Sequence, residues 1–224
     1  MKESIPSRSR TRATLLGAGI IVLLALGVAV LLTRNDDAPR RSLPGSDGNT
    51  ESDGEATGTP AFRFTTATRK LIPTSPGRIK RRQRKASGRA AVAARTVLDT
   101  LYTEGFLDPE NREQGRYADA FDGFASGAKK RAEARPGLLT AGARAGDRYE
   151  QILPLSSRID TRILLGRRGS PTLLLSHVRF SALATGPETF TLRSSGQFFF
   201  ERVRGSWKIV SFHVTRNDAP GEPA

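Results

Sequence analysis

An uninterrupted apolar segment near the N-terminus constrains this 224-residue chain more than any other feature. Residues 13–33 contain no charged side chain and are flanked by Arg12 and Arg34. A helix of these 21 residues, at about 1.5 Å per residue, is about 30 Å long, which matches the hydrocarbon core of a bilayer. The segment therefore predicts a single transmembrane helix, and we expect the rest of the chain to work beside a membrane.

A cleaved secretory signal is the alternative interpretation, because basic residues also precede the apolar segment. Signal h-regions usually span about 7–15 residues and end at a small-x-small site. Here the run continues through Leu32 into Thr33 and Arg34 without an A-x-A pattern, so we expect an uncleaved anchor. Four basic residues lie in the tail 1–12 and three closely follow the helix. The positive-inside rule then favours, by this narrow margin, a cytoplasmic tail and an extracytoplasmic C-terminal domain.

The excess charge is concentrated between the apolar segment and the first hydrophobic periodicity. Of the net charge of +14, residues 63–89 supply ten basic and no acidic side chains, whereas residues 35–62 have a net charge of −4. Gly, Ser, Thr and Asp dominate much of residues 35–76, and such a chain buries too little apolar surface to offset its ordering entropy. We therefore expect residues 34–89 to be a disordered linker. It ends in a basic cluster at 78–89: Arg78, Lys80, Arg81, Arg82, Arg84, Lys85 and Arg89.

The basic cluster indicates contact with a polyanion. Such a run attracts phosphates in a salt-dependent way, as nucleic-acid-binding segments do. However, no aromatic residue is interleaved for base stacking and no recognition motif surrounds it. Anionic lipid headgroups or acidic cell-wall polymers suit an extracytoplasmic domain better than nucleic acid does. A solvated run without any partner is the remaining alternative.

Hydrophobic periodicity marks residues 90–216 as one folded domain. Apolar residues recur every three or four positions over 91–102 and 117–128, which predicts two helices, and a weaker third is expected over 138–145. The period then changes to two, and four strands are expected, at 158–165, from Pro171 onward, at 190–203 and at 207–214. Helices followed by antiparallel strands predict an α+β domain, with a disordered tail at 217–224. The chain has no cysteine, which excludes disulfides, thiol catalysis and cysteine metal sites.

Three segments in this region carry a family resemblance: GFLDPENREQGRYADAFDGFASGAKK, LLTAGARAG and GQFFFERVRGSWKIVSF. Together they resemble the extracytoplasmic NTF2-like (cystatin-like) domains of actinobacterial single-pass membrane proteins, including those called Mce-associated. The resemblance covers about residues 90–216. It implies a cone of two or three helices packed on a curved antiparallel sheet of about four strands. It also implies an accessory protein of the cell envelope, and it transfers no catalytic residue.

Few side chains point to chemistry. The two histidines belong to no H-x-x-E-H or H-x-H pattern, so we expect no metal site, no cofactor and no catalytic activity. By fold analogy alone, a pocket at the mouth of the cone would be lined by Tyr102, Tyr117 and Trp207. His177 is expected to face solvent or a partner rather than the core. The run Phe198-Phe199-Phe200 predicts either packing on both sheet faces or an exposed apolar patch.

Two functions from different classes stay open. The first is a non-catalytic accessory or scaffold protein of the bacterial cell envelope, which presents its domain outside the membrane to a transport or secretion complex. Its anchor would raise the effective concentration of the domain near that complex. The second is a ligand-binding or catalytic module that uses the cone pocket for a lipid or another apolar molecule. A deep apolar cavity with a convergent buried Asp or Tyr would favour the second function, and a filled cone with an apolar exterior patch would favour the first.

Overall fold

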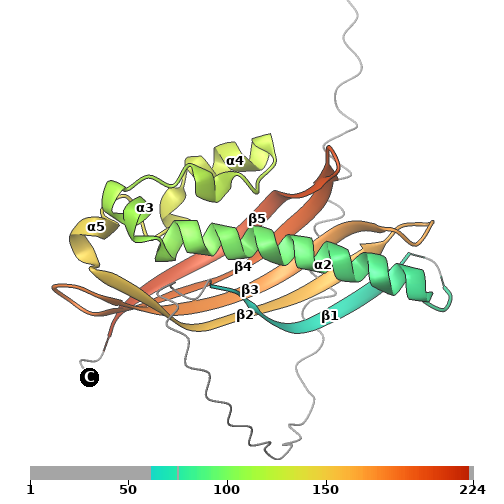
Figure 1. Ribbon diagram of the computed structural model, residues 1–224, viewed down its shortest axis with the longest axis horizontal. Helices are drawn as coiled ribbons and strands as arrows, with labels where there is room; N and C mark the ends of the chain where they lie inside the picture. Colours follow the sequence, from blue (N-terminus) through green and yellow to red (C-terminus); the bar gives the residue numbers. More distant parts are fainter. Residues whose placement is uncertain (1–61, 75, 222–224) are drawn as a thin grey trace, which may run out of the picture. The chain divides into compact units, whose positions relative to one another are not determined.

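The structure, a computed structural model, describes residues 62–74 and 76–221 of the chain. A five-stranded sheet has the order β1-β2-β3-β4-β5 (Figure 1). Its strands are β1 (Thr65–Pro73), β2 (Gln151–Leu165), β3 (Pro171–Thr185), β4 (Phe190–Val203) and β5 (Ser206–Pro220). The helices are α2 (Arg81–Tyr102), α3 (Pro109–Gln114), α4 (Ser126–Glu133) and α5 (Ala145–Arg148), with a π-helical turn at Thr103–Leu107 and 3-10 turns at Asp119–Phe121 and Pro136–Leu138. The predicted α+β class is confirmed.

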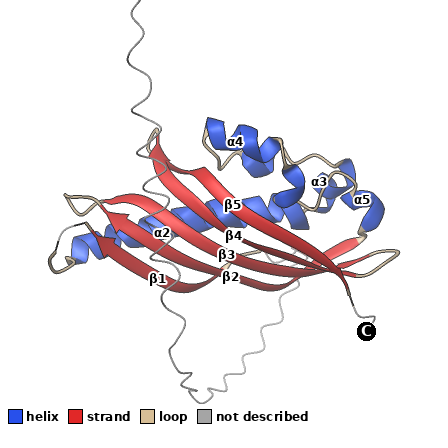
Figure 2. Cartoon of the chain, turned by 180° about the vertical axis from the view of Figure 1, so that it is seen from behind, coloured by secondary structure: helices blue, strands red, loops and turns tan. Residues whose placement is uncertain are grey.

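All the labelled helices lie on one face of the sheet, and α2 runs across it (Figures 1 and 2). One stripe of α2, formed by Ala90, Ala94, Leu98 and Leu101, is buried because these residues recur every three or four positions. Strands β2 to β5 alternate in burial, as expected for a sheet that is covered on one face. The core therefore lies between the helical layer and the sheet.

The run of three phenylalanines follows this alternation. Phe198 and Phe200 are fully buried in the core, whereas Phe199 is half-buried on the opposite face of β4. Strand β4 spans the predicted residues 190–203, and the next two residues form the turn to β5. The prediction that His177 faces away from the core is also confirmed, since it lies on the face opposite Val178 and Phe180.

The predicted boundaries of the folded domain were wrong at both ends. The sheet has five strands, because residues that the sequence assigned to the linker form β1, which pairs in parallel with β2. Phe64 just before it is 2% exposed, and its backbone N–H donates to Asp99 Oδ1 at 2.8 Å. Helix α2 also begins within the predicted linker, so the basic cluster at 78–89 is largely helical. At the other end, β5 extends to Pro220 and takes in part of the predicted tail.

The second predicted helix, which starts at 117 and is ended by Pro136, forms only in its later half as α4, because its first half is a 3-10 turn followed by a break. At this break the backbone turns to bond with β5, where Ala125 N–H donates to the Ile209 carbonyl at 2.9 Å. The helix predicted over 138–145 forms only at its edges. In the middle of this segment, the guanidinium of Arg216 donates hydrogen bonds to the carbonyls of Thr140 and Ala141.

The predicted cytoplasmic tail 1–12, the predicted transmembrane helix 13–33 and the linker up to residue 61 lie outside the described residues. Within residues 62–74 and 76–221, no helix combines the length and the hydropathy that crossing a bilayer requires. The anchor therefore stays a prediction.

Candidate functional site

An aromatic cluster fills the space between α2 and the middle of the sheet. Tyr102 at the end of α2 meets Phe64 edge-on, with ring centroids 4.9 Å apart, and stacks on Phe106 at 5.3 Å. Phe180 of β3 closes the cluster, with its ring centroid 5.0 Å from Tyr102 and 5.4 Å from Phe106. All four side chains are at most 3% exposed. These four rings fill the interior of the fold at the end of α2.

The Tyr102 hydroxyl is engaged inside this cluster. It shares a hydrogen bond of 2.9 Å with Ser194 Oγ, and both residues are buried. Burial raises the pKa of Tyr102 well above its ordinary value, and the bond to Ser194 lowers it by less. The phenol therefore stays protonated at neutral pH and links α2 to β4.

The other two predicted pocket residues lie in different surroundings. Tyr117 is 6% exposed, and its hydroxyl donates to the Gly142 carbonyl at 2.9 Å, which holds two loops together. Trp207 starts β5 and is 9% exposed, at the edge of an open groove. The structure thus gives Tyr102 and Tyr117 bonds within the protein and places only Trp207 beside open space.

This Trp207 groove has a volume of about 680 Å³ and lies between α2 and the β4–β5 hairpin. Its apolar lining includes Ala90 and Val97 of α2 and Pro171 of β3. Basic side chains also line it: Arg89, Arg202 and Lys208. The guanidinium of Arg202 lies 5.9 Å from the Trp207 ring centroid, a cation–π contact. The groove therefore combines apolar surface with positive charge.

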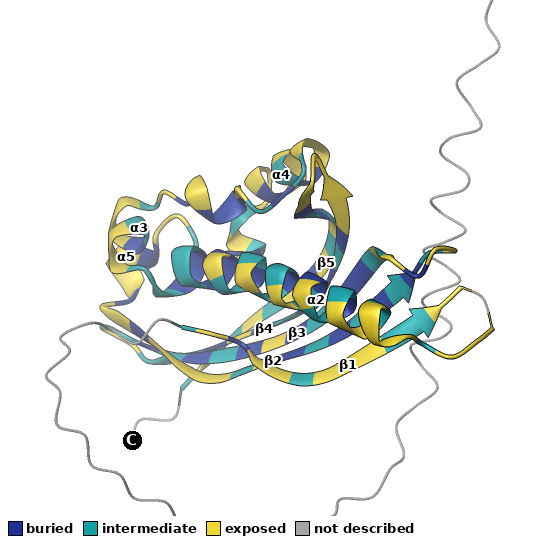
Figure 3. Cartoon of the chain, turned by 45° about the vertical axis from the view of Figure 1, so that its right-hand side comes forward, coloured by how far each residue is buried: buried dark blue, intermediate teal, exposed yellow. Residues whose placement is uncertain are grey.

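The basic cluster occupies the first turns of α2 and the residues just before them. All seven of its side chains are exposed, and none of them makes an ion pair within the described part of the chain. Arg81, Lys85 and Arg89 recur every four residues on the outer face of the helix, opposite its buried stripe (Figure 3). The first turn of α2 contains no acidic residue.

Two hairpins add further cations beside this helix end. Arg167 and Arg168 lie in the β2–β3 turn, whose Gly169 touches the Gln83 side chain of α2. Arg202 and Arg204 belong to the β4–β5 hairpin, where the acidic Glu201 precedes them. We call the following set the basic end: Arg78, Lys80, Arg81, Arg82, Arg84, Lys85, Arg89, Arg167, Arg168, Arg202 and Arg204. The sequence analysis missed the four hairpin arginines, although alternate turns of an antiparallel sheet must lie at the same end.

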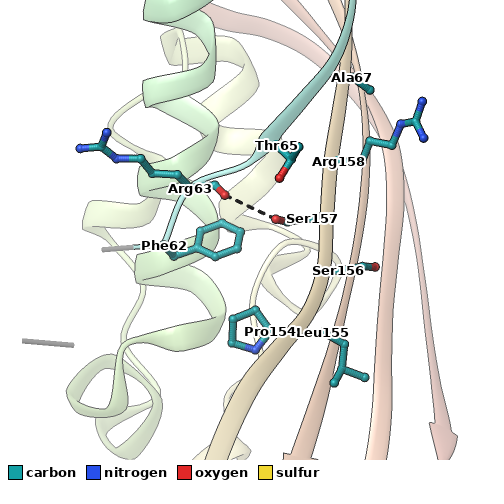
Figure 4. Close-up of a pocket in the computed structure, with 9 residues that line it drawn as sticks. All are labelled: Phe62, Arg63, Thr65, Ala67, Pro154, Leu155, Ser156, Ser157 and Arg158. Atoms are coloured by element: carbon teal, nitrogen blue, oxygen red, sulfur yellow. Dashed lines mark hydrogen bonds between the residues drawn. The ribbon is translucent and has the colours of Figure 1, made fainter. Parts of the chain in front are cut away.

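A second open pocket, of about 690 Å³, lies where β1 begins (Figure 4). Strand β1 pairs only with Arg158–Leu165 of β2, so the earlier part of β2 has no β1 partner. Leu155 lies at a bulge there and is 60% exposed, and Ser157 Oγ donates to the Arg63 carbonyl at 3.4 Å. Neither a carboxylate nor a histidine lines this pocket, which gives it no acid–base chemistry.

The helix-free face of the sheet carries both histidines. The register places Asp160, His177, Gln197 and His213 in one row across four strands, so Gln197 separates the two imidazoles. Partial burial, with help from the nearby Arg179 charge, lowers the pKa of His177. In the region the structure describes, no three His, Asp or Glu side chains group closely enough to hold a metal ion.

Comparisons with known proteins do not place the chain in a family. It matches no family model, no curated protein and no solved structure.

Proposed function

We propose that this chain is a non-catalytic accessory or scaffold protein of the bacterial cell envelope. The helix predicted at 13–33 would anchor it, and the α+β domain would stand outside the membrane as an NTF2-like module of the Mce-associated kind. There it would present its outer surfaces to a transport or secretion complex. The enclosed aromatic cluster is the observation that carries this proposal.

The filled interior favours a scaffold over an interior-pocket enzyme. An active site inside the fold needs free acid and base groups around a space for substrate. Here Tyr102, Phe64, Phe106 and Phe180 occupy that space, and the Tyr102 hydroxyl is bonded to Ser194. The surfaces that remain for recognition are external ones.

A ligand-binding module is the second candidate function, and the Trp207 groove favours it. The groove is open, is partly apolar and has arginines at its rim. It lies at the edge of the fold rather than in its interior, so a ligand there would meet both the protein and its surroundings.

The side of the membrane on which the domain lies tests the proposed function. Because the chain has no cysteine, a single Glu188→Cys substitution in the exposed β3–β4 turn gives one labelling site. A membrane-impermeant maleimide should label it equally in intact and lysed cells. Ser7→Cys, in the predicted cytoplasmic tail, is the matched control and should be labelled only after lysis. Labelling of Glu188→Cys only after lysis would place the domain inside the cell and refute the proposal.

A further inference from the structure

We propose that the basic end docks on the surface of an anionic bilayer, with the lipid phosphate groups as its counter-charges. The inference rests on the proposed membrane anchor and goes beyond it, because it names the surface that meets the membrane. Docking would hold the domain in one orientation and leave its opposite end free for a partner.

The excess of basic over acidic side chains is the first argument. The basic end contains eleven cations from α2, the segment before it and two hairpins, and no acidic residue occurs between positions 56 and 98 of the chain. Four of these cations, Lys80, Arg81, Arg82 and Arg84, lie at the start of α2, where the positive end of the helix dipole disfavours them. An anionic surface would offset this local repulsion.

The shape of the helix face is the second argument. Arg81, Lys85 and Arg89 lie in line on the outer face of α2, and eight residues of helix separate the first from the last by about 12 Å. Val92, one turn further along this face, is 54% exposed. The Trp207 groove adds apolar surface beside the same stripe. Basic side chains next to exposed apolar ones are typical of surfaces that lie on a membrane interface.

The β4–β5 turn supplies an independent third argument. Arg204 has a φ of 50° and is the one non-glycine residue with positive φ in the described ranges. It is followed by Gly205 at φ 88°, and a two-residue hairpin turn of this kind favours Asn or Gly at both positions. An arginine at this position adopts an unfavourable backbone conformation and places a cation at the tip of a hairpin in the basic end.

Nucleic acid fits these observations less well than a membrane does. The exposed stripe on α2 has no aromatic side chain on which a base could stack. The cations form a surface on one helix and two hairpins rather than a groove that follows a strand.

The test uses the full chain reconstituted in phosphatidylcholine vesicles, with or without about 30 mol% phosphatidylglycerol to supply negative surface charge. A polarity-sensitive fluorophore is attached at Ser206→Cys in the basic end. The matched position is Glu188→Cys, in the β3–β4 turn at the opposite end of the sheet. We expect a blue shift at position 206, not at 188, and only in anionic vesicles. Raising the salt from about 0.1 M to about 1 M should reverse it, because the Debye length falls from about 10 Å to about 3 Å.

Two charge-matched variants then locate the effect. Removing three cations with R81Q/K85Q/R89Q should reduce the docking equilibrium about a hundredfold, at about 1 kcal/mol per basic residue near the surface. The control R116Q/R144Q/R193Q removes the same net charge from exposed sites outside the basic end and should leave the shift intact. Equal losses in both variants would overturn the proposal, since net charge alone would then explain the attraction.

Other outcomes are equally decisive. Equal shifts at 206 and 188, or no shift at 206 in anionic vesicles, would overturn docking through the basic end. Binding of a short DNA duplex would also overturn the proposal, if that binding depends on salt, is abolished by R81Q/K85Q/R89Q and occurs while the vesicle shift is absent. Flotation after an alkaline wash tests separately whether the chain is anchored in the bilayer. A chain that leaves the vesicles refutes the proposed membrane anchor, whereas a chain that stays but shows no shift at position 206 refutes only the docking.

Discussion

The buried bond between Tyr102 and Ser194 gives the sharpest test of the interior as a packed core. If the pair is structural, Tyr102→Phe leaves the Ser194 hydroxyl without its partner, and Ser194→Ala leaves the Tyr102 hydroxyl without one. An unsatisfied buried polar group costs about 1–3 kcal/mol, whereas removal of both partners is close to neutral. We therefore expect each single variant to lose about 1–2 kcal/mol of unfolding free energy. The double variant should lose less than the two losses added together.

Trp207 makes this measurement direct. It is the chain's single tryptophan and is 9% exposed, so its emission should shift to the red when urea unfolds the domain. A loss of about 1 kcal/mol corresponds to about 2–4 °C in melting temperature for a domain of this size. Additive losses, or a Tyr102→Phe variant as stable as the parent, would refute the structural role of this bond.

The same pair gives a pH signature. Because burial raises the pKa of Tyr102 in the folded state, the unfolded chain gives up this proton first, at about pH 10. The stability that Tyr102 contributes is therefore complete below about pH 10 and is lost as the pH rises further. Tyr102→Phe should remove this alkaline loss. An unchanged alkaline profile would show that Tyr102 ionises freely.

Three further predictions concern the sheet and its turns. Phe64→Ala should lower the free energy of unfolding by about 3–5 kcal/mol, because it empties a buried site next to β1, while Leu153→Ala at an exposed site should lower it little. The urea midpoints of the two variants measure this difference. Gly169→Ala should destabilise by at least about 1 kcal/mol, because φ is +71° and a Cβ atom would overlap a side chain of α2, whereas Gly127→Ala in α4 meets no neighbour and should not destabilise. Partial burial opposes ionisation of Asp160, but hydrogen bonds and nearby arginines outweigh it and lower its pKa. Asp160→Asn should therefore lose up to about 1 kcal/mol at pH 7 and progressively less as the pH falls below about 4, because the stability from a lowered carboxyl pKa is lost as the pH falls through that pKa.

Local patterns were sufficient to predict the strands whose partners are adjacent in sequence. Strands β3, β4 and β5 form hairpins, and each carries its own period-two pattern and a turn signal at its end. The run Phe198-Phe199-Phe200 left the buried face of β4 undetermined, because three consecutive aromatic residues show no alternation. Of the predicted pocket residues, only Trp207 lies beside open space. The sequence could not distinguish it from the other two, because an aromatic residue that packs in a core and one that lines a groove have the same sequence signal.

Strand β1 could not be predicted in this way. Its nine residues are mostly exposed and show no alternation, because it is an edge strand. Its stabilisation comes from parallel pairing with β2, more than 80 residues later, and from Phe64, which packs on Phe180 of β3. The linker predicted from composition therefore extends too far along the chain, past the start of the folded domain. An isolated fragment 90–216 would lack β1 and Phe64, so we expect it to expose the aromatic cluster.

The correction to the linker changes what the basic cluster can do. On a disordered chain, its cations would spread over many arrangements, and ordering them on a surface would cost entropy for every residue. On α2 the helix fixes them in advance, with Arg81, Lys85 and Arg89 on one face, and the antiparallel order of the sheet brings the Arg167 and Arg204 turns to the same end. Several weak attractions to a membrane then act together without a new ordering cost. This is why the proposed docking depends on the positions of the charges and why a charge-matched variant elsewhere on the domain should leave it intact.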